Sequence, residues 1–120
     1  MSGSATSYSR SGLADWIAQR LSAVILAAYF LVMVAIWLGH PDYANWHGVM
    51  MAMPMRIFSL LALFALAAHA WIGMWTVLTD YVTARHMGPL ADVMRWFLEV
   101  LFALALFVEV VWGIQILWGL

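Results

Sequence analysis

Residues 57–79 read IFSLLALFALAAHAWIGMWTVLT and contain no Asp, Glu, Lys or Arg. As an α-helix, a segment of this length rises roughly 34 Å, which is enough to cross the hydrocarbon core of a bilayer. One ionisable side chain, His69, lies near the middle of the segment. An imidazole at that depth must find a partner inside the membrane, so we interpret His69 as a functional residue.

The composition assigns the whole chain to the membrane. Of its 120 residues, 67% are hydrophobic and only 9% are charged, which is typical of an integral membrane protein. Residues 21–39 contain no charged side chain, and residues 96–120 contain only Glu99 and Glu109. We therefore predict an all-α membrane protein with three transmembrane helices, at residues 17–39, 57–79 and 96–118.

The same composition excludes several classes of function. The segments between the predicted helices are too short to form a soluble catalytic domain with its own core. The chain has no cysteine, which excludes disulfides, thiolate metal sites and cysteine nucleophiles. Its net charge of -1 gives no sign of nucleic-acid binding. Chemistry on a soluble substrate would therefore need a further protein chain.

The arginines predict the orientation in the membrane. Arg10 and Arg20 precede the uncharged residues 21–39 of the first predicted helix, Arg85 and Arg95 lie between the second and third helices, and only Arg56 lies between the first and second. Because positive charge concentrates on the cytoplasmic side, we expect a cytoplasmic N-terminus and a periplasmic C-terminus. The chain then forms one membrane-anchor domain, residues 1–120, with a polar tail, an outer loop and a cytoplasmic loop at residues 1–16, 40–56 and 80–95.

The outer loop is expected to contain a short helix. Asp42 follows Pro41 at a turn and is a suitable N-terminal cap. The apolar residues that follow indicate either a segment lying on the membrane surface or contacts that fill gaps against a neighbouring subunit. They are Trp46, Met50, Met51, Met53 and Met55.

His69 shares one face of its predicted helix with small and polar residues. At 100° per residue, five positions fall within about 40° of it: Ala62, Ala65, Gly73, Thr76 and Asp80. Such a face lets a flat group or another helix approach closely, and imidazole is a common axial ligand of haem iron. The alternative is that His69 bonds a hydroxyl or carbonyl of a neighbouring helix while the small residues only pack helices. No other histidine lies in a predicted span, so a haem with two histidine ligands would take the second from another chain.

The sequence from the middle of this helix onward is similar to a known family. Residues 69–75, HAWIGMW, followed by residues 78–82, LTDYV, resemble the hydrophobic membrane anchor of succinate dehydrogenase (complex II). Gly12, Asp15 and Arg20 form a second match before the first helix. The resemblance covers essentially the whole chain and is weak in the third helix.

The resemblance implies a place in a complex of four different chains in the bacterial cytoplasmic membrane. In such a complex, a flavoprotein oxidises succinate to fumarate and an iron–sulfur protein relays the electrons. Two membrane chains, the hydrophobic anchor and its membrane partner, hold this pair, enclose haem b in their shared helical bundle and reduce ubiquinone. The present chain would then be a multi-pass subunit that is not catalytic alone. Such complexes can associate into higher oligomers.

The resemblance also implies roles for four residues. His69 would be one axial ligand of the haem b iron, with the other histidine supplied by the membrane partner, and Arg20 would pair with a haem propionate. Tyr81 would donate a hydrogen bond to a carbonyl oxygen of ubiquinone, and Asp80 would support that site. From the residues alone, Tyr81 also fits an interfacial anchor, Asp80 a solvated carboxylate and Arg20 an ordinary cytoplasmic-side arginine.

Glu109 has no counterpart in the family pattern. We expect it to make a neutral hydrogen bond to a neighbouring chain rather than to form a proton pathway. A small multidrug transporter would need a carboxylate in its first helix, and residues 21–39 have none. Two alternatives stay open, namely a haem-free structural anchor and a homodimeric b-type cytochrome that uses His69 from each chain.

Overall fold

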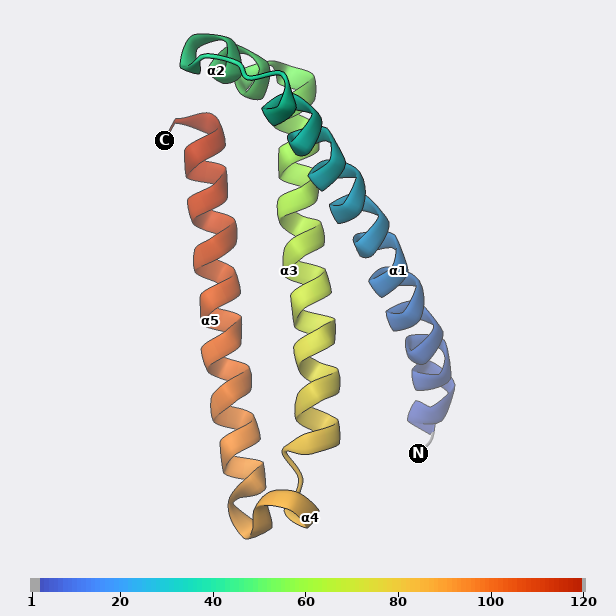
Figure 1. The fold of residues 1–120 in the computed structure, drawn as a ribbon. Helices are drawn as coiled ribbons and strands as arrows, with labels where there is room; N and C mark the ends of the chain where they lie inside the picture. The colour runs from blue at the N-terminus through green and yellow to red at the C-terminus, as the bar shows by residue number, and fades with distance from the viewer. Residues whose placement is uncertain (1–2, 120) are drawn as a thin grey trace.

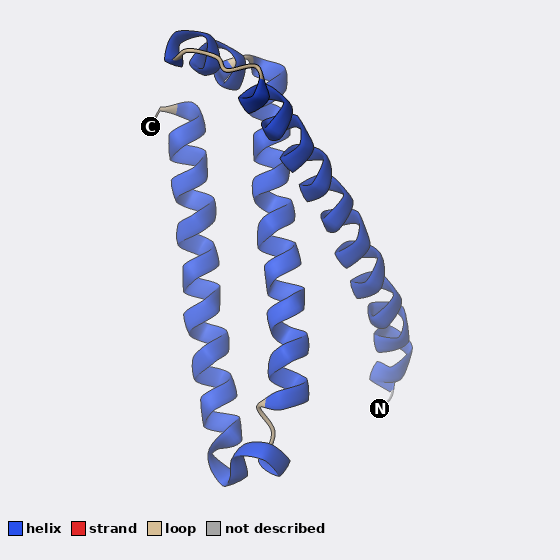
Figure 2. Ribbon diagram, viewed as in Figure 1, coloured by secondary structure: helices blue, strands red, loops and turns tan. Residues whose placement is uncertain are grey.

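The computed structural model describes residues 3–119, and these are almost entirely helical (Figures 1 and 2). Three helices are long and apolar enough to cross a membrane, which confirms the predicted all-α class with three spans. The long helices are α1 (Gly3–Leu38), α3 (Met53–Tyr81) and α5 (Ala91–Trp118). The short elements are α2 (Tyr43–Met51), α4 (Ala84–Met87) and the 3-10 helix η1 (Gly88–Leu90).

Helix α3 is the central element, and both α1 and α5 pack against it. In Figure 1, α2 lies across one end of the bundle beside the C-terminus, and α4 lies at the other end. Helix α1 leans away from α3 toward its own N-terminal turns, on the side of α4. We call these two ends the α2 end and the α4 end. The molecule is 55 Å long and 28 × 26 Å across, so its long axis exceeds the thickness of a bilayer core.

The helices extend beyond the apolar segments that predict them. Helix α1 begins at Gly3, so the polar tail expected at residues 1–16 is helical wherever it is described; residues 1–2 lie outside the described part. Helix α3 begins at Met53, with Pro54 in its first turn. Proline has no backbone N–H, and the N–H groups of a first turn have no partner within the helix, so no hydrogen bond is lost there. Hydropathy marks the part of a helix that meets lipid, whereas backbone hydrogen bonding continues into the polar flanks.

The connection at the α2 end follows from its turn residues. His40 adopts a positive φ of 49°, which reverses the chain after α1. The Asp42 side chain then accepts a hydrogen bond from the Asn45 backbone N–H at 2.8 Å and caps α2. At the other terminus of α2, Ala52 is extended (φ -63°, ψ 143°) and leads directly into α3. Helix α2 therefore lies across the bundle and packs on the first turns of α3.

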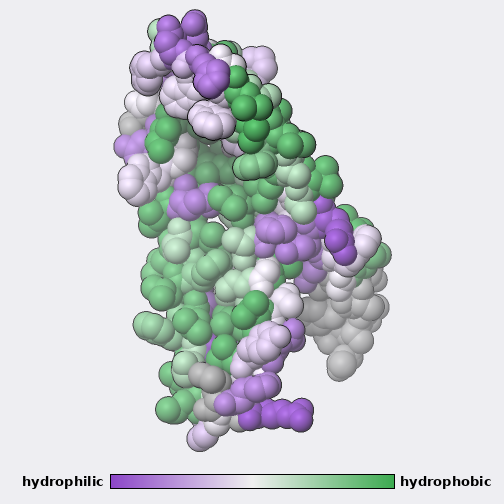
Figure 3. All heavy atoms as spheres, in the orientation of Figure 1, coloured by the Kyte–Doolittle hydropathy of each residue, from purple (hydrophilic) through white to green (hydrophobic). Residues whose placement is uncertain are grey.

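Few of the side chains that the structure describes are buried. The buried apolar residues are Met50, Ala62, Ala65, Leu78, Ala91 and Leu117. Most of the large apolar side chains are exposed, and the face in Figure 3 is mainly hydrophobic, with hydrophilic residues gathered at the two ends and beside the first turns of α1. Such a surface is stable when lipid or other membrane proteins cover it.

Candidate functional site

The small-residue face of α3 contacts α1. Ala62 and Ala65 on this face are buried, which allows the two helices to approach closely. Where α1 passes His69, Ser22 is also buried, and its Oγ lies 3.0 Å from Nδ1 of His69. The sequence suggests two partners for this face, a flat group or another helix. Within this chain the face packs against a helix, α1.

The hydrogen bonds around Ser22 assign the proton on the histidine ring. Ser22 Oγ lies 3.0 Å from the backbone oxygen of Gln19 as well as 3.0 Å from His69 Nδ1. A carbonyl oxygen only accepts, so the Ser22 hydroxyl donates to Gln19 and His69 Nδ1–H donates to Ser22. The opposite assignment would leave two oxygen lone pairs facing each other at 3.0 Å.

The same assignment determines what the other ring nitrogen can do. With its proton on Nδ1, a neutral imidazole carries a lone pair on Nε2. No hydrogen bond to Nε2 of His69 is found among residues 3–119, and the side chain is only half-buried. A histidine that donates through one nitrogen and keeps the other free is in the form that binds a metal.

A second polar group lies one helical turn from His69. A Cβ atom added to Gly73 would lie 3.8 Å from Nε2 of Gln19, so the Gln19 side chain lies close to the α3 backbone. Its Oε1 is buried and has no hydrogen-bond partner in the described part of the chain. Buried acceptors are rarely left unpaired, so this oxygen is expected to meet water or a donor from another chain.

The donor set of this chain fits one position in a haem site. Among the residues described, no cluster of three or more His, Cys, Asp or Glu side chains could hold a metal ion. Haem iron takes four nitrogen donors from its porphyrin, so a protein has only axial ligands to supply. The single imidazole of His69 is therefore sufficient for a shared axial site and insufficient for a metal centre held by this chain alone.

Arg20 lies apart from His69. Its guanidinium carbon is 5.3 Å from the centroid of the Trp16 ring, and both side chains are exposed. Arg20 precedes Ser22 by two residues, which places it about 160° around α1 from the face that contacts α3. The structure thus brings Ser22, rather than Arg20, next to the histidine.

Asp80 and Tyr81 form a separate group at the α4 end. They occupy the last turn of α3, and both are exposed. The Tyr81 ring centroid is 6.3 Å from that of His86, and no ion pair to Asp80 is found among the described residues. The helical rise from His69 to Tyr81 is roughly 18 Å, so these residues do not share a pocket with the imidazole.

Arg95 organises this end of the bundle, which the sequence reasoning missed. Its Nη1 donates a 2.7 Å hydrogen bond to the backbone oxygen of Val82, and its Nη2 pairs with Asp92 at 2.6 Å. These contacts tie the start of α5 to the residue that follows Tyr81. The spacing of Asp92 and Arg95 was the available signal for their pair, whereas nothing in the sequence indicates the contact with Val82.

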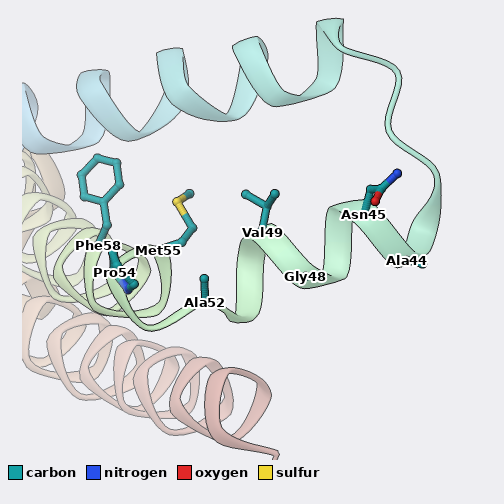
Figure 4. Close-up of a pocket in the computed structure, with 8 residues that line it drawn as sticks. All are labelled: Ala44, Asn45, Gly48, Val49, Ala52, Pro54, Met55 and Phe58. Carbon is teal, nitrogen blue, oxygen red and sulfur yellow. The ribbon is translucent and has the colours of Figure 1, made fainter.

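Two hollows in the surface lie toward the α2 end, away from these residues. One, of about 830 Å³, lies at the junction of α2 and α3 (Figure 4). Its lining contains Asn45, Met55 and Phe58 but no titratable side chain, so we assign it no chemistry. A hollow of about 360 Å³ opens between α1, α2, α3 and α5, and the Tyr29 hydroxyl on its wall lies 2.7 Å from Ser59 Oγ.

Glu109 has no partner among the described residues of this chain. Both of its carboxyl oxygens are buried and lack a hydrogen bond to any of them. Gly113, one turn further along α5, lies so close to Leu63 that an added Cβ would be 2.6 Å from the leucine side chain. The glutamate thus lies near an apolar contact with α3, and the described residues offer its carboxyl group no hydrogen-bond partner.

Comparisons with known proteins agree with this architecture. The model of the succinate dehydrogenase/fumarate reductase transmembrane subunit family matches residues 1–88, which end before α5. The succinate dehydrogenase hydrophobic membrane anchor subunit of Coxiella burnetii (strain RSA 493 / Nine Mile phase I) is 39% identical over 112 residues, covering 92% of this chain and 91% of that protein. The chain therefore belongs to the family of succinate dehydrogenase/fumarate reductase transmembrane subunits, as a hydrophobic membrane anchor of succinate dehydrogenase.

Proposed function

We propose that this membrane anchor supplies His69 as one axial ligand of haem b and contributes Tyr81 to a ubiquinone-reduction site. Its membrane partner supplies the second histidine, and the iron–sulfur protein and the flavoprotein complete the complex. The observation that supports this proposal best is the 3.0 Å contact between His69 Nδ1 and Ser22, because it leaves Nε2 free. When bound, haem b takes up and releases single electrons within the membrane.

Each residue near the haem has a separate task in this proposal. His69 would hold the haem through Nε2, with its ring held by α1, and Gly73 one turn away leaves room for the Gln19 side chain of α1. Arg20 pairs with a propionate, which requires its side chain to leave Trp16. That exposed cation–π contact is worth only about 0.5–1 kcal/mol, whereas a two-pronged bond to a carboxylate is stronger.

At the α4 end, the proposed task is to bind the quinone head group. The Tyr81 phenol donates a hydrogen bond to a carbonyl oxygen, and the exposed ring is accessible to a ligand held between chains. Asp80 is exposed to solvent and supports the site by exchanging protons with water. Arg95 keeps the end of α3 in place through its bond to Val82.

The proposed topology places the α4 end in the cytoplasm. The N-terminus of α1 and the α3–α5 connection lie at this end, and four of the five arginines lie in the first half of α1, in this connection or in the first turns of α5. The iron–sulfur protein would dock here, next to Tyr81. The membrane is then the cytoplasmic membrane of a bacterium, as expected for a chain similar to a Coxiella membrane anchor.

The quinone role is tested with the Tyr81→Phe variant of the purified complex. We expect ubiquinone reduction to fall at least about tenfold, because a hydrogen bond used to orient the substrate is lost. Succinate oxidation by an artificial soluble acceptor should be unchanged. Tyr43→Phe, which alters an exposed tyrosine on α2, is the matched control. Equal loss of both activities in Tyr81→Phe would refute the assignment.

One observation favours a second candidate, a haem-free anchor. The bond between Ser22 and His69 gives the histidine a partner inside the membrane without any cofactor. The two candidates differ in haem content, so absence of a b-type spectrum from the purified wild-type complex would select the haem-free anchor. Under that outcome the proposal for Tyr81 stands unaltered.

A further inference from the structure

We propose that Ser22 is a positioning residue for the haem ligand: its hydroxyl oxygen accepts the Nδ1 proton of His69, fixes the tautomer and tunes the iron-binding nitrogen Nε2. The inference rests on the proposed ligation of haem b by His69. It goes beyond that proposal by assigning a role in the electronic properties of the haem to a side chain on a different helix.

The position of Ser22 suits this task because its hydroxyl has a fixed direction. Its proton is engaged by the Gln19 backbone oxygen at 3.0 Å, so an oxygen lone pair remains for His69 Nδ1 at 3.0 Å. Ser22 is only 4% exposed, so water does not compete for that lone pair. The acceptor is therefore rigid, dry and part of the helix that packs against the ligand.

An acceptor bonded to Nδ1–H makes the opposite nitrogen a stronger electron donor. A stronger donor favours the more positively charged, ferric state of a haem iron. Loss of the Ser22 hydroxyl should therefore raise the midpoint potential. Outer-shell partners of metal-ligating histidines typically change affinity by about tenfold or more, and tenfold corresponds to about 59 mV for a one-electron couple.

The same helix pair offers a matched control. Ser59 is also buried, and its Oγ lies 2.7 Å from the Tyr29 hydroxyl. It belongs to the α1–α3 interface but is ten residues, or roughly 15 Å of helical rise, from His69. Ser59→Ala thus removes the same atom from the same interface without touching the ligand.

A conservative variant separates the hydroxyl from the shape of the side chain. Ser22→Thr keeps a hydroxyl and adds one methyl group. Space for this methyl exists, because Ser22 borders a hollow of about 230 Å³ that is otherwise lined by Leu21, Ile25 and other apolar residues. Threonine should therefore retain the bond to His69, whereas alanine loses it.

The test is a redox titration of the haem in the purified complex carrying Ser22→Ala, Ser22→Thr or Ser59→Ala. We expect Ser22→Ala to raise the midpoint potential by about 59 mV, which corresponds to a tenfold change in the ratio of ferric to ferrous haem, or to lose haem outright. Ser22→Thr and Ser59→Ala should keep the wild-type potential. The visible spectrum recorded in the same titration reports whether haem is still low-spin.

Two kinds of failure are distinguishable. If haem is present and Ser22→Ala titrates like Ser59→Ala, or Ser22→Thr shifts as far as Ser22→Ala, the role of Ser22 is refuted and ligation by His69 stands. If the wild-type complex has no haem, or His69→Ala keeps an unchanged haem, the proposed ligation fails and the role of Ser22 fails with it.

Discussion

The two helix interfaces of this chain are built differently. Between α1 and α3, small residues bring the helices together and hydroxyl groups form specific bonds, as at Ser22 with His69 and Tyr29 with Ser59. Between α3 and α5, the contact is mainly apolar, with Gly113 pressed against Leu63 and the carboxyl group of Glu109 without a partner among the described residues. The first interface is specific and the second is tight.

The difference shows where function is placed in a membrane bundle. Lipid tails are as apolar as the side chains of these helices, so the hydrophobic effect does not drive the helices together within the membrane. Close steric fit must therefore stabilise the α3–α5 pair. Hydrogen bonds between membrane helices average only about 0.6 kcal/mol, so those of the α1–α3 pair contribute more to register than to stability. Register determines which atom lies next to His69, and that is what a ligand site requires.

Gly113→Leu should have the largest effect on stability, because it tests the tight interface. A Cβ alone would approach Leu63 to 2.6 Å, so a larger side chain must separate α3 from α5. We expect a destabilisation of about 1–3 kcal/mol, typical of overpacking, measured as a lower thermal midpoint of the detergent-solubilised complex. Gly48→Leu is the control, since nothing lies within 4 Å of a Cβ there. Equal midpoints for the two variants would contradict the tight-interface description.

The hydroxyl pair between α1 and α3 should have a smaller effect. Tyr29→Phe removes one partner but keeps the ring that contacts Phe58 edge-on at 5.1 Å, and Ser59→Ala removes the other. In a double-mutant cycle on the complex, we expect a coupling of about 0.6 kcal/mol. A coupling above about 2 kcal/mol would mean that polar bonds, rather than fit, stabilise this interface, because values in membrane proteins reach only about 1.7 kcal/mol.

Glu109→Gln should have the smallest effect. If Glu109 makes a neutral hydrogen bond outside this chain, an amide of the same shape can donate in its place. Quinone reductase activity of the purified complex should therefore stay within about twofold of the wild type. A twofold change corresponds to less free energy than the roughly 1 kcal/mol that a lost hydrogen bond would cost. A large loss of activity with the complex still assembled would instead indicate a proton pathway through this interface.

The sequence predicted the spans because three long apolar segments leave few alternatives in a chain of this length. It predicted the family from the residues around His69 and Tyr81, and both predictions are confirmed. Helix ends were less predictable: α1 and α5 begin before the apolar segments because polar residues also form helices outside the bilayer. The roles of His69, Tyr81, Asp80 and Arg20 stay predictions.

The partner of His69 could not be identified from the sequence. Ser22 is 47 residues away, and its contact depends on how α1 is rotated and crossed against α3. A helical projection shows which residues share a face of one helix but not which face its neighbour presents. The same rotation places Arg20 on a different side of α1, which the sequence pattern did not indicate. Long-range register is thus the information that the structure adds.

The central claim is that His69 ligates haem b, and a reduced-minus-oxidised optical spectrum of the purified complex tests it most directly. The wild type should show a low-spin b-type signal that is lost in His69→Ala and kept in His47→Ala, which alters an exposed histidine of α2. The flavoprotein and the iron–sulfur protein should copurify with all three. A b-type signal that survives in His69→Ala, or is absent from the wild type, would contradict the claim.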